Sequence, residues 1–216
     1  MTTTVLFDMD GVLVSSEPHW KRHWRNEVFP EVQEGTPTLD DVTGRNFRES
    51  LAMLDETYGL PGGTERFETE ATEFAEEMYR EEVTVTDGMA ELFSLIREAG
   101  LSLGIVSSSP PQWISLVLDR SAFGDLDVVV SAEDIEAPGK PNPAVYDHAL
   151  DTLSADPAES IVVEDSKNGV RAASQAGATV IRYQCDHATE PFSGADYVAE
   201  NIEALRTHLR QLIDEE

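Results

Sequence analysis

The sequence predicts an α/β fold, a doubly wound parallel sheet into which a helical lobe is inserted after the first strand. Three observations support this prediction. Short apolar runs rich in β-branched residues alternate with helical patterns along most of the chain. The runs are continuously apolar, which is typical of parallel strands that helices cover on both faces. One block between the first and second runs contains helical patterns only.

The predicted strands are the apolar runs at residues 5–7, 103–106, 128–130, 161–163 and 180–183. Between them, apolar side chains recur every three or four residues, as on one face of a helix. These helical patterns comprise Met89, Leu92, Leu95 and Ile96; Ile114, Val117 and Leu118; Val145, Ala149 and Leu153; and Val170, Ala173 and Ala176. The first and the last end at Gly100 and Gly177, because glycine readily adopts the backbone conformation that terminates a helix.

The block from residue 15 to residue 83 carries further amphipathic patterns. They are Trp20, Trp24 and Val28; Phe47, Leu51, Leu54 and Tyr58; and Phe67, Ala71, Phe74 and Met78. Strands and helices alternate again only after Asp87 and Gly88. We therefore predict two domains, an α/β core formed by residues 1–14 and 84–216 and a helical lobe formed by residues 15–83. The tryptophans of the lobe are expected in its core.

The charge balance indicates the setting of the protein. Forty-two acidic residues against fifteen basic ones give a net charge of −27, although the charged fraction is an ordinary 26%. Such self-repulsion is screened at molar salt, so we interpret the chain as a halophilic cytoplasmic protein. A merely acidic surface and a binder of basic partners are the alternatives, and the even spread of the acids argues against the second. Without a basic face, no nucleic-acid partner is expected.

Other features of the sequence also favour a cytoplasmic protein. The sequence has no apolar run of about eighteen residues and no signal-peptide pattern, so neither a membrane partner nor export is expected. The single Cys185 agrees with a reducing compartment and is expected only to pack. His19, His23, His148 and His208 lack ligand-like spacing and are expected at the surface. We expect a monomer.

Polar side chains follow the predicted strands. Ligands of open α/β sheets bind at the carboxyl ends of the strands, so we expect these groups to meet at one edge. Any one of the aspartates is more simply explained as a turn or helix-cap residue, but four segments that deliver such groups together indicate a site. The groups are Asp8 and Asp10 after the first run, Ser107 after the second, Lys140 in the loop after the third, and Glu164 and Asp165 after the fourth.

Carboxylates beside a single ammonium would repel an anionic substrate unless a hard dication bound between them. We therefore expect Mg²⁺ as the cofactor and a small phosphorylated metabolite as the substrate. Lys140, Ser107 and nearby backbone N–H groups could hold the phosphoryl oxygens. One aspartate of the first pair could attack phosphorus, and the other, two residues away on the same side of an extended segment, could act as general acid and then as base.

Four segments, "FDMDGVLVSSEP", "GIVSSS", "GKPNP" and "VVEDSKNGVRAASQAGA", carry these residues. In order and spacing they resemble the four motifs of the haloacid dehalogenase superfamily, in its branch of β-phosphoglucomutase-like and phosphoglycolate-phosphatase-like proteins. The similarity extends from residue 5 to residue 183. It implies a Rossmann-like core with a helical cap inserted after the first strand, so that the helical lobe would be the cap.

The resemblance also implies a role for each residue of the site. Asp8 would be the nucleophile and a magnesium ligand. Asp10 would be the general acid/base and would bind the metal through its backbone carbonyl. The metal site would be completed by Glu164 and Asp165, and the phosphate would be held by Ser107, Ser108 and Lys140.

The predicted cap departs from the branch, whose members often have aspartate and histidine where this chain has Ser15 and Trp20. Phe47 lies where a mutase-like alignment would place a phosphate-binding arginine. Arg45 and Arg48 are candidates to bind a distal anion of the substrate, although an exposed arginine on a helix is often simply solvated.

Three functions follow from these features. The leading hypothesis is a magnesium-dependent phosphatase that hydrolyses a small phosphomonoester, such as a sugar phosphate, through an aspartyl-phosphate. The first alternative is a phosphosugar mutase of the β-phosphoglucomutase type, which the incomplete cap contacts argue against. The second alternative is a non-catalytic binding protein that retains the fold, which the intact acids and Lys140 argue against.

Overall fold

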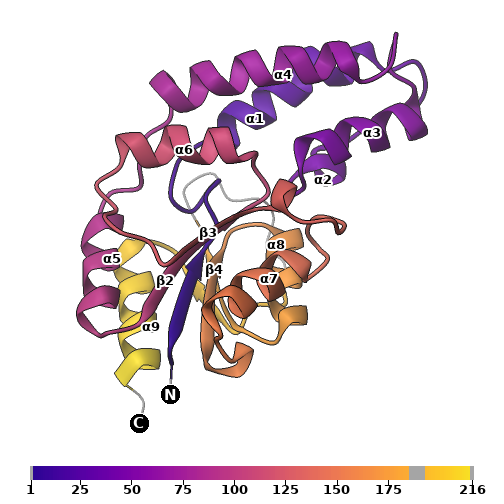
Figure 1. Cartoon of the computed structure of the whole chain (residues 1–216). Coiled ribbons are helices and arrows are strands. Elements are labelled where there is room, and N and C mark those ends of the chain that lie inside the picture. Colours follow the sequence, from indigo (N-terminus) through magenta and orange to yellow (C-terminus); the bar gives the residue numbers. More distant parts are fainter. Residues whose placement is uncertain (1, 185–192, 215–216) are drawn as a thin grey trace.

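The computed structural model describes residues 2–184 and 193–214. These residues form a parallel sheet with helices on both faces and a group of helices above one edge (Figure 1). Cys185 lies outside the described residues, so the expectation for its side chain stays a prediction. Along the described part of the chain, no helix combines the length and the apolar character needed to cross a membrane.

In the part of the chain that the structure describes, one sheet of six parallel strands forms the centre of the fold. Phe7 is in register with Ile105 on one side and with Val163 on the other, so the carboxyl ends of three central strands lie side by side. This alignment gathers the loops that follow these strands at one edge of the sheet. The strands are β1 (Thr4–Phe7), β2 (Ser102–Ser107), β3 (Val128–Ser131), β4 (Ser160–Glu164), β5 (Thr179–Tyr183) and β6 (Tyr197–Ala199), in the order β3-β2-β1-β4-β5-β6.

The predicted α/β class is confirmed, and each of the predicted strands is found with its ends within one residue of the expected limits. The apolar pattern does not reveal β6, which lies at the edge of the sheet. This strand has only three residues, and one of them, Val198, is 45% exposed. A short, half-exposed edge strand has no continuous apolar run, which explains why it escaped prediction.

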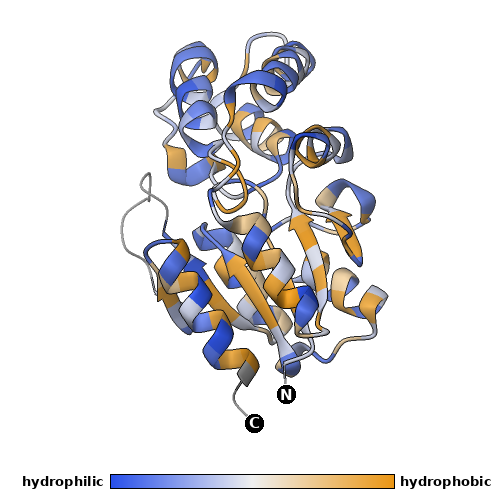
Figure 2. Ribbon diagram, turned by 90° about the vertical axis from the view of Figure 1, so that its left-hand side faces the viewer, coloured by the Kyte–Doolittle hydropathy of each residue, from blue (hydrophilic) through white to orange (hydrophobic). Residues whose placement is uncertain are grey.

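Helices cover both faces of the sheet (Figure 1). α5 (Met89–Glu98) and α9 (Ile202–Asp214) lie on one face, and α7 (Ala144–Leu153) and α8 (Lys167–Ala176) lie on the other. Along β1, Val5 and Phe7 belong to the apolar cluster of α5 and α9, whereas Leu6 belongs to the cluster of α7 and α8. The strands are therefore mostly apolar along their length (Figure 2).

The predicted cap, residues 15–83, contains helices that lie above the carboxyl edge of the sheet (Figure 1). They are α1 (Glu17–His23), α2 (Leu39–Val42), α3 (Phe47–Tyr58) and α4 (Glu65–Glu77), with π-helical segments at Trp24–Val28 and Met78–Glu82. Below them lies α6 (Pro111–Arg120), and short 3-10 helices occur at Phe29–Glu31, Ala132–Asp134 and Pro157–Glu159. The division into two domains stays a prediction.

One expectation for the predicted cap is wrong. His23 was expected at the surface, but it is only 6% exposed and stacks on Phe74 with the ring centroids 4.5 Å apart. Burial disfavours the charged imidazolium and lowers the pKa of His23 below its ordinary value. The residue continues the apolar face of α1, where Trp20 is also buried, toward the buried Trp24 at the start of the π-helical segment.

Candidate active site

Asp8 is the first residue after β1 and lies at a pocket between the sheet edge and the predicted cap. Its backbone N–H donates to the backbone oxygen of Val163 at 2.9 Å, which continues the pairing of β1 with β4. Its Oδ1 accepts a hydrogen bond from Lys140 Nζ at 2.6 Å. Burial raises the pKa of Asp8 well above its usual value, although Lys140 acts in the opposite direction. The carboxylate therefore faces a cation in a site that excludes most water.

Lys140 joins two carboxylates beside the pocket. Its Nζ donates at 2.6 Å to Asp8 Oδ1, at 2.6 Å to Glu164 Oε1 and at 3.2 Å to the backbone oxygen of Val106. The residue is 2% exposed. Burial lowers the pKa of Lys140, but the two carboxylates outweigh this and hold the pKa well above its usual value. Lys140 is thus a fixed positive charge whose three N–H groups all have acceptors.

Glu164 is the last residue of β4 and is fully buried. Its Oε1 accepts from Lys140 and, at 2.7 Å, from the hydroxyl of Tyr146. Its Oε2 accepts from the backbone N–H groups of the next two residues, at 3.2 and 3.4 Å. A Cβ atom at Gly169 would lie 1.8 Å from Oε1, so the carboxylate fits only because position 169 is glycine. These contacts hold Glu164 in one orientation beneath Lys140.

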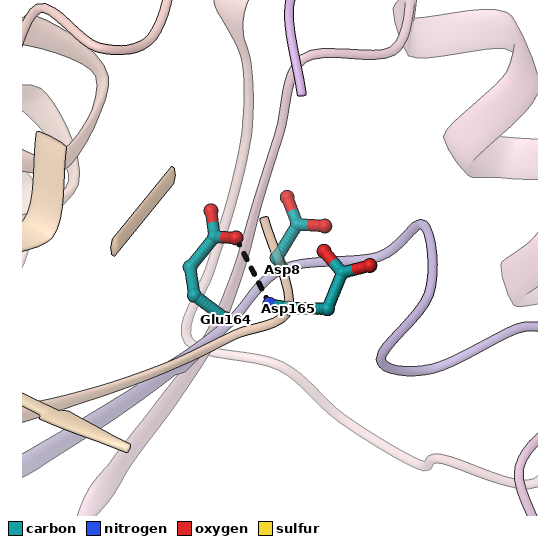
Figure 3. A group of neighbouring side chains, drawn as sticks. All are labelled: Asp8, Glu164 and Asp165. Carbon is teal, nitrogen blue, oxygen red and sulfur yellow. Dashed lines mark hydrogen bonds between the residues drawn. The ribbon is translucent and has the colours of Figure 1, made fainter. Parts of the chain in front are cut away.

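Asp8, Glu164 and Asp165 form an acidic cluster in which one ligand atom from each residue lies within 4.8 Å of the others. Figure 3 shows the three carboxylates pointing to the same side of the strand ends. Gly11, with φ +81°, passes so close that a Cβ atom there would lie 2.1 Å from Asp165 Oδ2. A set of carboxylate oxygens suits a hard cation such as Mg²⁺ or Ca²⁺. A buried acidic cluster able to hold a divalent cation is therefore present.

Asp10 lines the same pocket but is held by hydroxyl groups instead of a cation. Its Oδ1 accepts from Ser16 Oγ at 2.5 Å and from Tyr79 Oη at 2.5 Å, and its Oδ2 accepts from Ser109 Oγ at 2.6 Å. Burial, followed by the adjacent Asp10 carboxylate, raises the pKa of Tyr79 well above its usual value, so its hydroxyl remains a donor. The two aspartates of the first motif thus lie in different environments.

Ser107 and Ser108 lie differently from one another. Ser107 ends β2, is fully buried, and accepts a hydrogen bond from the backbone N–H of Ser109 at 3.0 Å. It is absent from the described lining of the pocket, whereas Ser108 and Ser109 are part of it. The buried Oγ of Ser108 has no hydrogen-bond partner among the described residues. Ser107 therefore shapes the loop, while Ser108 has a hydroxyl left for a ligand.

The two candidate arginines are separated by the structure. Arg45 lines the pocket. Arg48 is absent from the described lining and forms ion pairs with Glu133 and Glu68 instead. Arg45 thus remains a candidate to bind a distal group of a substrate, and Arg48 contributes to the surface of the predicted cap. The full described lining comprises Asp8, Asp10, Glu17, Trp20, Lys21, Trp24, Val42, Thr43, Gly44, Arg45, Phe47, Ser108, Ser109, Trp113, Lys140, Asp165 and Ser166.

Sequence reasoning missed several residues that complete the site. Ser109 is the last residue of the quoted motif "GIVSSS", but only Ser107 and Ser108 of that motif were assigned a role. Tyr146 occupies an apolar position of α7 six residues after Lys140, which disguises its polar contact with Glu164. Tyr79 and Ser16 lie in the predicted cap, and no motif in the sequence marks Tyr79 as a partner of Asp10.

Comparison with known proteins agrees with this geometry. The family model for haloacid dehalogenase-like hydrolases matches residues 2–177. The chain is 30% identical to validoxylamine A 7'-phosphate phosphatase of Streptomyces hygroscopicus subsp. limoneus, over 95% of this chain and 97% of that protein. It is 31% identical to a phosphorylated carbohydrates phosphatase of Thermotoga maritima, over 80% and 81% of the two chains.

A solved structure is also similar. The crystal structure of a mutant of CbbY from Rhodobacter sphaeroides in complex with xylulose-(1,5)bisphosphate has a TM-score of 0.76 and 25% identity, and the similarity covers 93% of this chain and 95% of that one. The extent of the family match, together with the acids and Lys140 at the carboxyl edge of the sheet, shows that the chain belongs to the haloacid dehalogenase-like hydrolases.

Proposed function

We propose that the chain is a magnesium-dependent phosphatase that hydrolyses a phosphomonoester of a sugar, or of a similar ring-shaped polyol, through an aspartyl-phosphate on Asp8. One observation carries the proposal: a buried Lys140 lies 2.6 Å from both Asp8 and Glu164. A carboxylate that only closes a turn does not need a buried ammonium beside it. The phosphatase names of two relatives support the same activity.

The reaction would have two steps. In the first, an oxygen of Asp8 attacks phosphorus and the bond from phosphorus to the leaving oxygen breaks, while Asp10 gives a proton to that oxygen. In the second, water attacks phosphorus, Asp10 takes a proton from the water, and the bond to Asp8 breaks to release inorganic phosphate. The charge of Lys140 and the hydroxyl of Ser108 would stabilise the phosphoryl oxygens.

The acidic cluster fits a magnesium site because its side-chain donors are all carboxylate oxygens. Asp8, Glu164 and Asp165 would hold the ion, together with the backbone carbonyl of Asp10. When bound, Mg²⁺ would supply positive charge for the phosphoryl oxygens beside an otherwise acidic pocket.

Aromatic side chains of the pocket support a ring-shaped substrate. Trp20, Trp24, Phe47 and Trp113 all line it, and ring faces of this kind pack against the apolar face of a substrate ring. Trp113 is 1% exposed, and its Nε1 has no hydrogen-bond partner among the described residues. An indole N–H in that position is suited to donate to a substrate hydroxyl. A sugar-like leaving group satisfies both features, whereas a short acid such as glycolate has no ring to pack against the aromatic side chains.

Hydrolysis is favoured over isomerisation because the predicted cap lacks some of the contacts that would keep water away from the aspartyl-phosphate. A mutase must protect its aspartyl-phosphate from water until the correct sugar closes the cap. Phe47 lines the pocket where a mutase-like alignment would place an arginine, and Ser15 forms a 2.7 Å hydroxyl contact with Thr84 instead of offering a carboxylate. Water is therefore the expected acceptor.

The test is phosphate release from a panel of esters with MgCl₂ in molar KCl. We expect turnover of hexose monophosphates to exceed that of phosphoglycolate, with Asp8→Asn as the inactive control. Incubation with β-glucose 1-phosphate and a trace of the sugar bisphosphate distinguishes a phosphatase from a mutase. A phosphatase yields more inorganic phosphate than glucose 6-phosphate as product. A large excess of glucose 6-phosphate would establish a mutase, and no turnover of any ester would establish a binding protein.

A further inference from the structure

Asp10 is contacted from three separate segments of the chain. Ser16 precedes α1, Tyr79 lies in the π-helical segment that ends the predicted cap, and Ser109 follows β2. Two of the three donors therefore come from the predicted cap. Both of these donate to Oδ1, while Ser109 alone donates to Oδ2. The two oxygens of Asp10 thus have different partners.

Trp20 fixes the direction of the hydrogen bond from Tyr79. Its Nε1 donates to Tyr79 Oη at 3.0 Å, and an indole nitrogen can only donate. The phenolic oxygen therefore accepts from Trp20, and its own hydrogen is directed to Asp10 Oδ1. Both aromatic residues are buried, and Arg120 Nη1 donates to the backbone oxygen of Tyr79 at 2.5 Å. Tyr79 is consequently held in place both at its hydroxyl and at its backbone oxygen.

We propose that Trp20 and Tyr79 are a positioning pair that keeps Oδ1 of Asp10 as an acceptor and leaves Oδ2 to exchange the proton in both steps of the reaction. The partner of Oδ2 allows this exchange, because the hydroxyl of Ser109 can accept as well as donate a hydrogen bond. The inference rests on the proposed function, since it requires Asp10 to act as general acid and base. Tyr79 is absent from the described lining of the pocket, so its effect acts through Asp10, whereas Trp20 also lines the pocket.

The test compares Tyr79→Phe, which removes one hydroxyl and keeps the ring, with Trp20→Phe, which removes the indole N–H. Tyr58→Phe makes the same chemical change elsewhere in the predicted cap, at a tyrosine that is absent from the described pocket lining. Each protein is assayed on glucose 6-phosphate and on p-nitrophenyl phosphate. The alkoxide of the sugar needs a proton from Asp10 to leave, whereas p-nitrophenolate leaves readily without one.

For Tyr79→Phe we expect kcat/KM on glucose 6-phosphate to fall at least about tenfold, a part of the usual contribution of general acid catalysis. On p-nitrophenyl phosphate, kcat/KM should stay within about threefold of the wild-type value. This parameter reports only the first step, in which the p-nitrophenolate leaving group needs no proton. The second step still needs Asp10 as a base, so p-nitrophenolate should appear in a burst that approaches one equivalent per enzyme. Trp20→Phe should show the same pattern more weakly, and Tyr58→Phe should behave as wild type.

The outcomes separate the two proposals. Equal losses on both substrates, or a change in KM alone, would show that Tyr79 is only structural and would leave the phosphatase proposal intact. Wild-type behaviour of Tyr79→Phe would also overturn the positioning role. If the wild-type protein turns over neither ester, both proposals fail. Circular dichroism and the melting temperature of each variant show whether it is folded. Trp20→Phe disrupts the same positioning pair at the indole N–H instead of the phenolic hydroxyl.

Discussion

Replacing Lys140 with methionine tests the central contact of the site. The change keeps an unbranched stem that reaches as far as Cε but removes the ammonium that lies 2.6 Å from Asp8 and 2.6 Å from Glu164. Two buried carboxylates would then face each other without a cation, and the loss of one partner from a buried ion pair costs about 3–5 kcal/mol of unfolding free energy. Loss of one preorganised charge at the phosphoryl group should cost a further ~2–4 kcal/mol of transition-state stabilisation, or about 30-fold to 10³-fold in kcat/KM.

The assay combines urea unfolding with phosphate release at saturating MgCl₂. Lys167→Met is the matched control, because Lys167 is exposed at the first residue of α8 and its loss should change the free energy of unfolding by less than about 0.5 kcal/mol. Activity is measured at urea concentrations where both variants remain folded. A Lys140→Met protein with wild-type kcat/KM would refute the role of Lys140 in the reaction. Unchanged unfolding would refute the argument that it neutralises two buried acids.

Loss of the nucleophile, of salt or of a buried histidine should each change a different property. Asp8→Asn should be inactive at any MgCl₂ concentration, and more than a few per cent of wild-type turnover in this variant would contradict the mechanism. EDTA should abolish phosphate release by the wild-type protein until MgCl₂ is restored. The melting temperature should fall as the KCl concentration drops from molar to tens of millimolar. The Debye length then grows from ~3 Å toward ~30 Å, so that the net charge of −27 is less screened. A melting temperature that stays constant would contradict the halophilic interpretation. His23 has a lowered pKa in the folded state, so its contribution to stability is complete above the unfolded-state pKa of about 6.5 and is lost as the pH falls below it. Unfolding of His23→Phe should therefore depend less steeply on pH in that range, and equal slopes for variant and wild type would show that His23 is not responsible.

The fold could be predicted from the sequence because its strands are continuously apolar and its helices keep a regular spacing. Residues 5–7 alternate between the two helical layers, so each side chain of the run had to be apolar. The order of the strands could not be predicted in the same way. It depends on which neighbours each strand pairs with, and the two faces of β1 give no indication that β2 and β4 flank it.

The chemistry of the site could be predicted where residues directly follow strands. Asp8, Glu164 and Asp165 converge because parallel strands in register bring their carboxyl ends together. Contacts that reach the site from helices could not be predicted, because their direction depends on packing. Tyr146 and Tyr79 illustrate this limit: each is a buried aromatic residue on a helix, and only the structure shows that its hydroxyl donates to a carboxylate.

The predicted cap contacts the core at the same loops that carry the proposed catalytic groups. Asn46 Nδ2 donates to the backbone oxygen of Ser108 at 3.0 Å, and the carboxylate of Glu49 accepts from the backbone N–H of Gly139 at 2.9 Å. Gly139 immediately precedes Lys140 in the chain. The loops after β2 and β3 are therefore each attached to the first turn of α3.

The remaining two loops are attached in the same way. Asn168, four residues after Glu164, donates to the backbone oxygen of Thr43 at 2.9 Å, and Tyr79 donates to Asp10. A movement that lifted the predicted cap would break a contact at every one of these loops. If substrate entry requires such a movement, we expect it to disturb the arrangement of the acids through the same hydrogen bonds. Substitutions of Asn46 or Glu49, which make these contacts, should consequently change kcat as well as KM, even though neither side chain meets the phosphate.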